Sequence, residues 1–376
     1  MNTFMIVALL ILVIAAYIHT FIRLIKILPQ TLWFRTTFCI LYFGGIVGYG
    51  VFLLFGNKIP LPITDGIYTY STSWVITLLY LLLIVLFIDL FQLINSQFKI
   101  INKEKVNKYF NRNRITTIFI FGLTTALLVF GYVIYFNKKR IHFTIETNKP
   151  LVSKNQIRIV AISDLHLGYT ISRNEALEWV ELINSEKPDI VIIGGDIIDN
   201  DLRPVNHDSS FLALKNIKAP MGVYACLGNH EYQSAVQNNF DFSQARIKML
   251  IDSVATTNGI TIIGRDDLVN VNRKSLKEII PANTDSSFTI LLDHQPLDLN
   301  AVVEEDIDFQ FSGHTHNGQV FPLQAITNAI YEVGYGYKKK RNTQFYVSSG
   351  LGIWGGKFRV FTRSEYIVID LVNNSK

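Results

Sequence analysis

The sequence predicts a membrane region of four transmembrane helices followed by an α/β domain. Two observations lead to this fold class. Of the 376 residues, 49% are hydrophobic and only 17% are charged, and the apolar excess is concentrated in the first third. After about Arg140 the pattern changes to short β-branched runs that alternate with amphipathic stretches, which is typical of an α/β domain. We therefore expect a membrane region at 1–140 and a second domain at 141–376.

Four apolar segments in the first third are long enough to cross a bilayer, which takes about 20 residues. They lie at 3–22, 36–55, 74–94 and 115–136. The first segment has no basic residues before it and no small-residue cleavage site after it, so we interpret it as an uncleaved helix. These segments predict a multi-pass protein of the cell membrane that has the lipid bilayer as a partner.

The basic residues of the short loops predict how these helices are oriented. The first loop has three Lys or Arg residues and the third has six, whereas the second has only Lys58. Because short cytoplasmic loops are enriched in Lys and Arg, the first and third loops are expected in the cytoplasm. Lys138, Lys139 and Arg140 favour the opposite orientation, but the two loops carry more charge. The second domain is therefore expected on the extracytoplasmic side.

Cysteine usage and net charge exclude several classes of protein. Cys39 and Cys226 lie far apart, so the sequence indicates neither a disulfide framework nor a zinc–thiolate site. The net charge of +5 is mild, and the basic residues form no concentrated stripe. A nucleic-acid polymer is therefore not expected as a partner.

The first candidate site is Asp164-Leu165-His166, which follows the apolar run 159–162. This run predicts a buried strand, and side chains two residues apart on a strand point the same way. Asp164 and His166 can therefore face one pocket, where a carboxylate and an imidazole suit a divalent metal ion. A capping aspartate beside a packed histidine is the alternative.

Four later strand ends carry the same kinds of side chain. They supply Asp196, the pair Asn229 and His230, then His294, and finally His314 with His316. Ligands of open α/β sheets bind at the carboxyl ends of the strands. Any one of these histidines is more simply a core residue, but five strand ends of this kind indicate a metal centre. Carboxylate and imidazole donors without sulfur suit Mn, Fe or Zn. Between these blocks, Phe240–Ala255 is expected to form a helix.

The order D-x-H, G-D-x-x-D, G-N-H-E, H and G-H-x-H resembles the calcineurin-like metallophosphoesterases over roughly 155–372. The stretches 163–168, 313–322 and 347–352 resemble its bacterial membrane-associated branch, which has an N-terminal multi-helix membrane region and includes relatives of diacylglucosamine-nucleotide hydrolases. Asn317 stands where that branch usually has glycine, and Ser364 stands where it commonly has proline. The resemblance implies an α/β/β/α sandwich.

The resemblance also implies a role for each site residue. One metal ion would be held by Asp164, His166 and His316, the other by Asn229, His294 and His314, with Asp196 bridging the two. A hydroxide between the ions would attack phosphorus. His230 would protonate the leaving group, and Asp199 would orient His230. For Asp199, a solvated acid in a turn is the alternative.

The expected function is that of a membrane-anchored, dinuclear-metal-dependent phosphoesterase, a metal-dependent phosphoric ester hydrolase that is more specifically a phosphodiesterase. Lipid-linked and nucleotide-linked phosphoesters are candidate substrates, and an apolar lip of Phe321, Ile353, Trp354 and Phe358 could hold acyl chains if these residues are not ordinary core. The alternative is a transporter or sensor with an accessory metal-binding domain, for which Asp89 and His19 are the intramembrane polar residues.

Three arginines have the chemistry of phosphate clamps. They are Arg203, Arg265 and Arg359. We take each of them to be a surface arginine unless a phosphate site is shown beside it.

Overall fold

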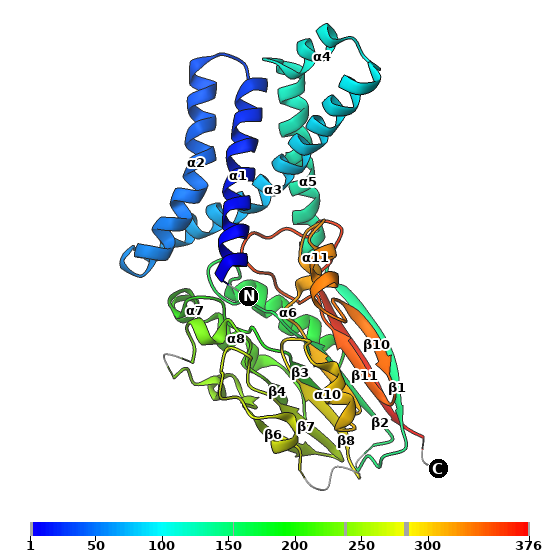
Figure 1. Cartoon of the computed structure of the whole chain (residues 1–376). Helices are drawn as coiled ribbons and strands as arrows, with labels where there is room; N and C mark the ends of the chain where they lie inside the picture. Colours follow the sequence, from blue (N-terminus) through cyan, green and yellow to red (C-terminus); the bar gives the residue numbers. More distant parts are fainter. Residues whose placement is uncertain (1–2, 153, 237–238, 282–285, 375–376) are drawn as a thin grey trace. The chain divides into compact units, whose positions relative to one another are not determined.

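The chain forms two compact units, residues 1–131 and 132–376. The computed structural model describes residues 3–152, 154–236, 239–281 and 286–374 (Figure 1).

The first unit is built from long apolar helices (Figure 1). Four helices are long and apolar enough to cross a membrane, which confirms the four predicted spans. They are α1 (Thr3–Ile27), α2 (Leu32–Phe55), α3 (Leu61–Phe98) and α5 (Arg114–Phe136), of which α5 continues into the second unit. The short helix α4 (Lys103–Phe110) lies between α3 and α5.

Helix α3 begins 13 residues before the apolar run 74–94 that predicted it. Its first half is rich in hydroxyl side chains, several of which are buried against neighbouring helices. The hydroxyl of Thr72, for example, donates to the carbonyl of Tyr68 at 2.8 Å. Because the hydroxyl of Thr72 is satisfied by its own helix, such a polar residue can be buried in a span where hydropathy alone would end it.

Asp89 of α3 is paired within the membrane unit. Its carboxylate lies 2.7 Å from Nε2 of His19 and also contacts the guanidinium of Arg23, which donates to Gln92 at 2.8 Å. This cluster joins α1 to α3. It pairs Asp89 with His19, the two polar residues on which the transporter alternative depends.

The second unit contains two six-stranded mixed sheets. The first sheet has the order β1-β12-β2-β3-β4-β5, and the second has the order β10-β11-β9-β8-β7-β6. The strands of the first sheet are β1 (Lys139–Thr147), β12 (Glu365–Asn373), β2 (Gln156–Ile162), β3 (Ile190–Ile193), β4 (Val223–Ala225) and β5 (Ile247–Met249). Those of the second are β10 (Gly336–Lys340), β11 (Thr343–Val347), β9 (Phe309–Ser312), β8 (Phe288–Leu292), β7 (Ile260–Gly264) and β6 (Ser253–Thr257).

Parallel pairing predominates around the strands that lead to the candidate site. β2, β3, β4 and β5 pair in parallel in one sheet, and β7, β8 and β9 pair in parallel in the other. β12 runs antiparallel to β2, with Ile369 opposite Ile159. Consecutive parallel strands bring their carboxyl ends to one edge of each sheet.

The core shows four layers, in the order helix, sheet, sheet, helix. Alternate residues of β2 enter different clusters: Val160 packs toward the helices, whereas Ile159 packs against the second sheet together with Ile290. On the outer face of the second sheet, Leu291 joins a further cluster. The helices of the second unit are α6 (Arg173–Ser185), α7 (Leu202–Asp208), α8 (Ser210–Ala213), α9 (Leu276–Ile279), α10 (Leu299–Glu304) and α11 (Gln324–Ile330). This layering matches the expected sandwich.

The helix expected at Phe240–Ala255 is wrong. The segment contains a 3₁₀ turn at Phe242–Ala245, then β5 and the start of β6. Its apolar residues are buried by β4, with which β5 pairs in parallel, and by the cluster around Phe211. Tertiary pairing therefore overrides the helical spacing of the apolar residues.

Candidate metal centre

The candidate site lies at the carboxyl ends of five strands from both sheets. β2 leads to Asp164 and His166, β3 to Asp196, β4 to Asn229 and His230, β8 to His294, and β9 to His314 and His316. The structure brings these side chains together although they are spread over some 150 positions of the chain. The site is formed within the second unit alone.

One group of donors consists of Asp164, His166 and His316. Their ligand atoms lie within 4.8 Å of one another. The Nε2 atoms of His166 and His316 are 3.0 Å apart, and Nε2 of His316 lies 3.5 Å from Oδ1 of Asp164. All three donors therefore converge on one point.

A second group consists of Asp196, His294 and His314, again with ligand atoms within 4.8 Å. Asn229 completes it, since its Oδ1 lies 2.8 Å from Nδ1 of His314. Nδ1 of His294 lies 2.6 Å from the carbonyl oxygen of Gly194, which fixes that nitrogen as the donor.

Asp196 connects the two groups. Its Oδ2 lies 3.1 Å from Nε2 of His294 and 3.7 Å from Nε2 of His166. Its other oxygen accepts the backbone N–H of His230 at 2.9 Å. One carboxylate oxygen therefore lies between imidazoles of both groups, which is where a bridging ligand would stand.

The buried atoms of this site fit divalent cations. Nε2 of His294 is buried without a hydrogen-bond partner and lies 3.1 Å from the Asp196 carboxylate, while its Nδ1 is bound to the carbonyl oxygen of Gly194. Nε2 is therefore the ring nitrogen that is left to bind a metal ion together with the Asp196 carboxylate. The donor set of imidazoles, carboxylates and one amide oxygen suits Mn, Fe or Zn.

The electrostatics of the site point the same way. Burial lowers the pKa of the His294 imidazole, but the carboxylates of Asp196 and Asp164 outweigh burial and raise it well above its usual range. Burial and His294 lower the pKa of His314 to about 4, which keeps that imidazole neutral. The carboxylates thus favour positive charge at the centre, and a neutral imidazole is the form that binds a metal ion.

The backbone around the ligands is held in a conformation that few residues adopt. Asp164, His166, Asp196, His314 and His316 all have φ between 47° and 69°. Such strain persists only where the surroundings enforce it, and it is frequent at functional sites.

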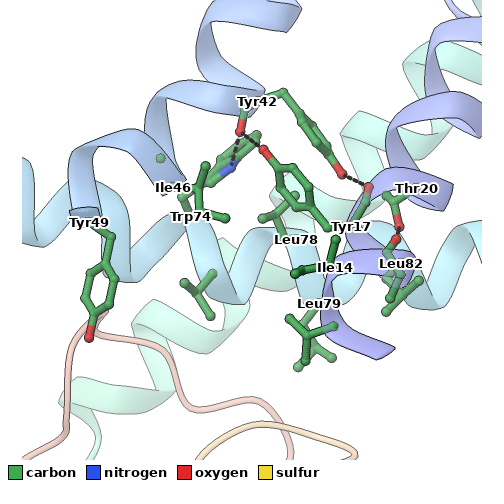
Figure 2. A pocket seen from close by; sticks show the side chains of 14 residues that line it. Ile14, Tyr17, Thr20, Tyr42, Ile46, Tyr49, Trp74, Leu78, Leu79 and Leu82 are labelled. Carbon is green, nitrogen blue, oxygen red and sulfur yellow. Dashed lines mark hydrogen bonds between the residues drawn. The ribbon is translucent and has the colours of Figure 1, made fainter. Parts of the chain in front are cut away.

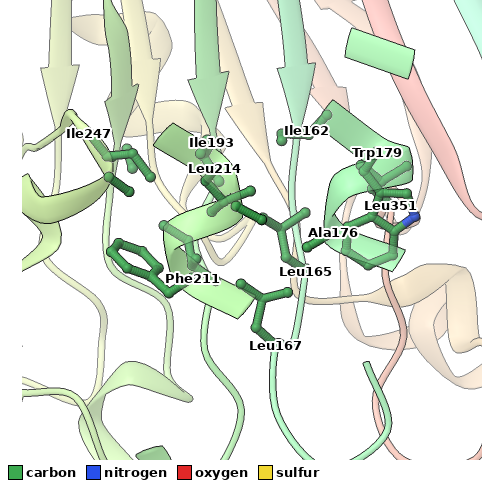
Figure 3. Close-up of a cluster of buried hydrophobic side chains, with 14 of the residues drawn as sticks. Ile162, Leu165, Leu167, Ala176, Trp179, Ile193, Phe211, Leu214, Ile247 and Leu351 are labelled. Carbon is green, nitrogen blue, oxygen red and sulfur yellow. The ribbon is translucent and has the colours of Figure 1, made fainter. Parts of the chain in front are cut away.

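Packing beneath Asp164 and His166 enforces their placement. Leu165 and Leu167 alternate with them and are fully buried in the helix-side core beside Ala176 (Figure 3). The two leucines therefore anchor this segment in the core while Asp164 and His166 face the site.

Gly195 shows why the turn after β3 needs glycine. Its φ is +86°, and a Cβ atom there would lie 2.6 Å from Nδ1 of His294. A side chain would displace that imidazole, so glycine allows β3 and His294 to approach closely.

His230 and Asp199 lie beside the ligand groups. Nδ1 of His230 is 2.9 Å from Oδ1 of Asp199, and Nδ1 of His166 is 3.6 Å from the same oxygen. Asp199 is 1% exposed, so the solvated-turn alternative is wrong. Burial lowers the pKa of His230, but the carboxylates of Asp196 and Asp199 outweigh burial and raise it to about 9.

Glu231 is a buried residue of the site for which no role was predicted. Its carboxylate accepts three backbone N–H groups: those of Asp196 at 3.0 Å, Gly228 at 2.6 Å and Ile198 at 2.9 Å. It therefore fixes the loop after β3 against the loop after β4. The sequence signal for Glu231 is its position directly after Asn229 and His230. Its role was not predicted because two of its backbone partners, Asp196 and Ile198, are distant in sequence.

Arg359 is not a surface arginine. It is fully buried, and its guanidinium donates to the carbonyls of His316 at 2.7 Å, Ser349 at 2.5 Å and Gly352 at 3.1 Å. A charge buried in this way supports the turn that carries His316.

The other two arginines are also engaged by the protein. Arg265 is buried and donates to Asp293 at 3.0 Å, so the surface expectation is wrong for it as well. Arg203 is half-buried and lies 2.7 Å from Asp201. These contacts give no support to a phosphate clamp at either position.

Comparison with known proteins shows which proteins this domain resembles. Residues 157–318 match the family model "Calcineurin-like phosphoesterase". An uncharacterized metallophosphoesterase of Campylobacter jejuni is 32% identical over 232 residues, which cover 58% of this chain and 60% of that protein. A transmembrane protein with metallophosphoesterase domain from Danio rerio is 31% identical over 268 residues, covering 66% of this chain and 61% of that protein.

The chain thus spans about 60% of the length of these relatives. Among solved structures, the Plasmodium inner-membrane-complex anchor GAP50 is 14% identical with a TM-score of 0.35, and the match covers 59% of this chain and 82% of that one. A TM-score of that size carries no conclusion. The sequence match and the metal-ligand geometry agree: residues 157–318 of this chain are similar to the calcineurin-like phosphoesterases.

Proposed function

We propose that the chain is a membrane-anchored, dinuclear-metal-dependent phosphoesterase whose catalytic domain is 141–376. The observation that carries this proposal is the position of Asp196. Its Oδ2 lies 3.1 Å from Nε2 of His294 in one donor group and 3.7 Å from Nε2 of His166 in the other. Pairs of donor groups joined by one carboxylate suit two ions about 3.5–4 Å apart.

The seven proposed ligands form two sets, one for each metal ion, with one ligand shared between them. Asp164, His166 and His316 would hold one ion; Asn229, His294 and His314 would hold the other; Asp196 would be shared. Two bound divalent ions supply activation of water and neutralisation of phosphate charge. Their identity is proposed as Mn, Fe or Zn from the donor chemistry.

His230 has the position of a proton donor. Its Nδ1 lies 2.9 Å from Oδ1 of Asp199, so Nε2 is the ring nitrogen that could deliver a proton to a leaving alkoxide. Asp199 would hold the ring in that orientation and stabilise its protonated form. Neither residue is proposed as a metal ligand.

The substrate proposed is a phosphodiester, with lipid-linked or nucleotide-linked esters as candidates. The bilayer anchor keeps the domain near lipid headgroups, and the exposed rings of Phe321 and Phe361 pack against each other with centroids 5.7 Å apart. Ile353 is fully buried, so it belongs to the core and not to an apolar lip. The stretches 163–168, 313–322 and 347–352 resemble the bacterial membrane-associated branch of the family, and this resemblance supports lipid-linked or nucleotide-linked esters as substrates.

We further propose that the catalytic domain lies outside the cytoplasm. The loop between α3 and α5 carries five basic residues, and a sixth, Arg114, begins α5. The loop between α1 and α2 is flanked by three more basic residues, Arg23 and Lys26 in α1 and Arg35 in α2. If the loop between α3 and α5 is in the cytoplasm, the single span α5 that follows it places the second unit on the extracytoplasmic side.

The test is an assay of the full chain in nanodiscs, stripped of metal and then reloaded with Mn or Zn. Bis(p-nitrophenyl) phosphate, p-nitrophenyl phosphate and a lipid-linked diester are compared, and bound metal is counted. We expect metal-dependent turnover of the diesters with two ions per chain. Absence of turnover with both ions bound would contradict the proposal.

His230→Ala tests the proton donor in the same assay. Turnover should fall about 10²-fold or more while both ions remain bound. The control is His207→Ala, since His207 is an exposed histidine in α7. Unchanged turnover in His230→Ala would refute the role of His230.

A further inference from the structure

The membrane unit contains a cavity of about 300 Å³ between α1, α2 and α3 (Figure 2). This volume lies at the lower end of the range for ligand pockets. Its lining is almost wholly aliphatic and aromatic, and it consists of Val13, Ile14, Ala16, Tyr17, Thr20, Tyr42, Gly45, Ile46, Tyr49, Trp74, Val75, Leu78, Leu79 and Leu82.

The polar atoms at one end of this cavity are already hydrogen-bonded within the protein (Figure 2). The hydroxyls of Tyr17 and Tyr42 donate to each other's backbone carbonyls at 2.9 and 2.7 Å. The indole N–H of Trp74 donates to the carbonyl of Tyr42 at 3.0 Å, and the hydroxyl of Thr20 donates to Ala16 at 2.8 Å. These donors therefore already have partners within the protein, and the lining of the cavity favours an apolar ligand.

The cavity lies at the middle of each membrane span. Its lining includes Tyr17 from the span Val7–Ile27, Gly45 from Leu32–Lys58 and Leu79 from Leu61–Phe98. Spans of this length place their central residues in the hydrocarbon layer of a bilayer. Acyl chains surround the helices at that depth, which excludes water-soluble polar ligands.

We propose that this cavity binds one acyl chain of a membrane phospholipid. Tyr17, Tyr42 and Trp74 form its rigid end, because their cross-helix hydrogen bonds join α1 and α3 to α2. The chain enters from the bilayer and packs against Ile14, Ile46 and Leu79. The proposal concerns the membrane unit only and does not depend on the phosphoesterase activity.

Two pairs of variants separate binding in the cavity from contact with bulk lipid. Ala16 lines the cavity, whereas its neighbour Ala15 is exposed outside it, so Ala16→Phe fills the space and Ala15→Phe does not. On α2, Ile46 lines the cavity, whereas Val47, which is also exposed, does not. Ile46→Phe and Val47→Phe therefore form an independent second pair.

The experiment places the full chain in phosphatidylcholine nanodiscs that contain a trace of phosphatidylcholine with a diazirine on one acyl chain. After irradiation, adducts are mapped by mass spectrometry. We expect adducts concentrated on lining residues of α1, α2 and α3, lost in Ala16→Phe and Ile46→Phe and kept in Ala15→Phe and Val47→Phe.

Circular dichroism of every variant checks that the helices remain. If Ala16→Phe unfolds the bundle, the Ile46→Phe pair decides the result, and the map of the unmodified chain decides it independently. Adducts spread evenly over lipid-facing residues such as Leu12 and Leu53 would overturn the proposal. Equal labelling of the filled variants and their controls would overturn it as well.

Discussion

Oδ1 of Asp199 faces two imidazoles, with Nδ1 of His230 at 2.9 Å and Nδ1 of His166 at 3.6 Å. One of these rings is the proposed proton donor and the other is a proposed metal ligand. A single buried carboxylate thus relates the two functions of the site. Its own pKa is lowered despite burial, because hydrogen bonds and charge from both histidines favour the ionised form.

Asp199→Asn removes this charge while it preserves the shape of the side chain. We expect turnover to fall by about 10-fold to 10²-fold with little change in KM. The carboxylate of Asp199 raises the pKa of His230, whose protonated form donates. Activity should therefore be lost at a lower pH in the variant than in the unmodified chain, as measured by a pH profile of kcat.

Metal content distinguishes this positioning role from a loss of the metal site. Two ions should remain bound in Asp199→Asn, as in the control Asp241→Asn, which changes an exposed helix cap. An unshifted pH profile would show that Asp199 does not act through His230.

The sequence was sufficient to predict which side chains meet at the site. Asp164 and His316 are 152 positions apart, yet Asp164 lies two residues after β2 and His316 four residues after β9, and parallel strands bring their carboxyl ends to one edge of each sheet. Strand position is set by local apolar runs, which a sequence shows. The proposed roles of these residues stay predictions until metal binding and turnover are measured.

The features that the sequence did not predict depend on distant partners. Arg359 is buried because three carbonyls from other turns accept its protons. Glu231 binds amides 33 and 35 residues earlier in the chain. The segment 240–255 becomes strands because β4 is available as a pairing partner. None of these partners is marked by local composition or periodicity.

Glu231→Gln should weaken metal binding without changing any ligand. The amide group of Gln has one acceptor oxygen, whereas the carboxylate accepts three backbone N–H groups. We expect metal affinity to fall by about 10-fold to 100-fold, as is usual when an outer-shell partner is lost. Metal titration of the stripped protein measures this effect.

The control for this prediction is Glu181→Gln, an exposed change in α6. Thermal unfolding without metal shows whether the fold itself is affected. Equal metal affinity in Glu231→Gln and the control would mean that the loops after β3 and β4 are held by other contacts.

The orientation of the catalytic domain can be tested by cysteine labelling in intact cells. The background variant Cys39→Ala removes the one cysteine that is not buried. In that background, Asn374→Cys should react with a membrane-impermeant maleimide, because the exposed end of the second unit is predicted outside. Lys105→Cys, in the basic loop that carries α4, should react only after lysis. The reverse pattern would place the catalytic domain in the cytoplasm.

Lys138 is a buried amine next to the end of α5. Its side chain is 9% exposed, and its Nζ lies 3.5 Å from the centre of the Tyr135 ring and 3.9 Å from Oε1 of Glu175. Glu175 is already bound by Lys357 at 2.6 Å and by the Tyr135 hydroxyl. Burial lowers the pKa of Lys138 to about 7, and the charge of Glu175 only partly opposes this shift.

This pKa predicts that Lys138 destabilises the fold at neutral pH. Between about pH 7 and 10.5 the unfolded chain binds the proton that the folded chain releases, so stability rises with pH over this window. Lys138→Met should therefore raise the Tm of the detergent-solubilised chain at pH 7, by roughly 2–4 °C per kcal/mol gained. The gain should shrink toward pH 10, where the amine of the unfolded chain also loses its proton. Lys139→Met, at the exposed neighbouring position, should leave both Tm values unchanged. A constant gain at both pH values would show that packing, and not the charge of Lys138, is responsible.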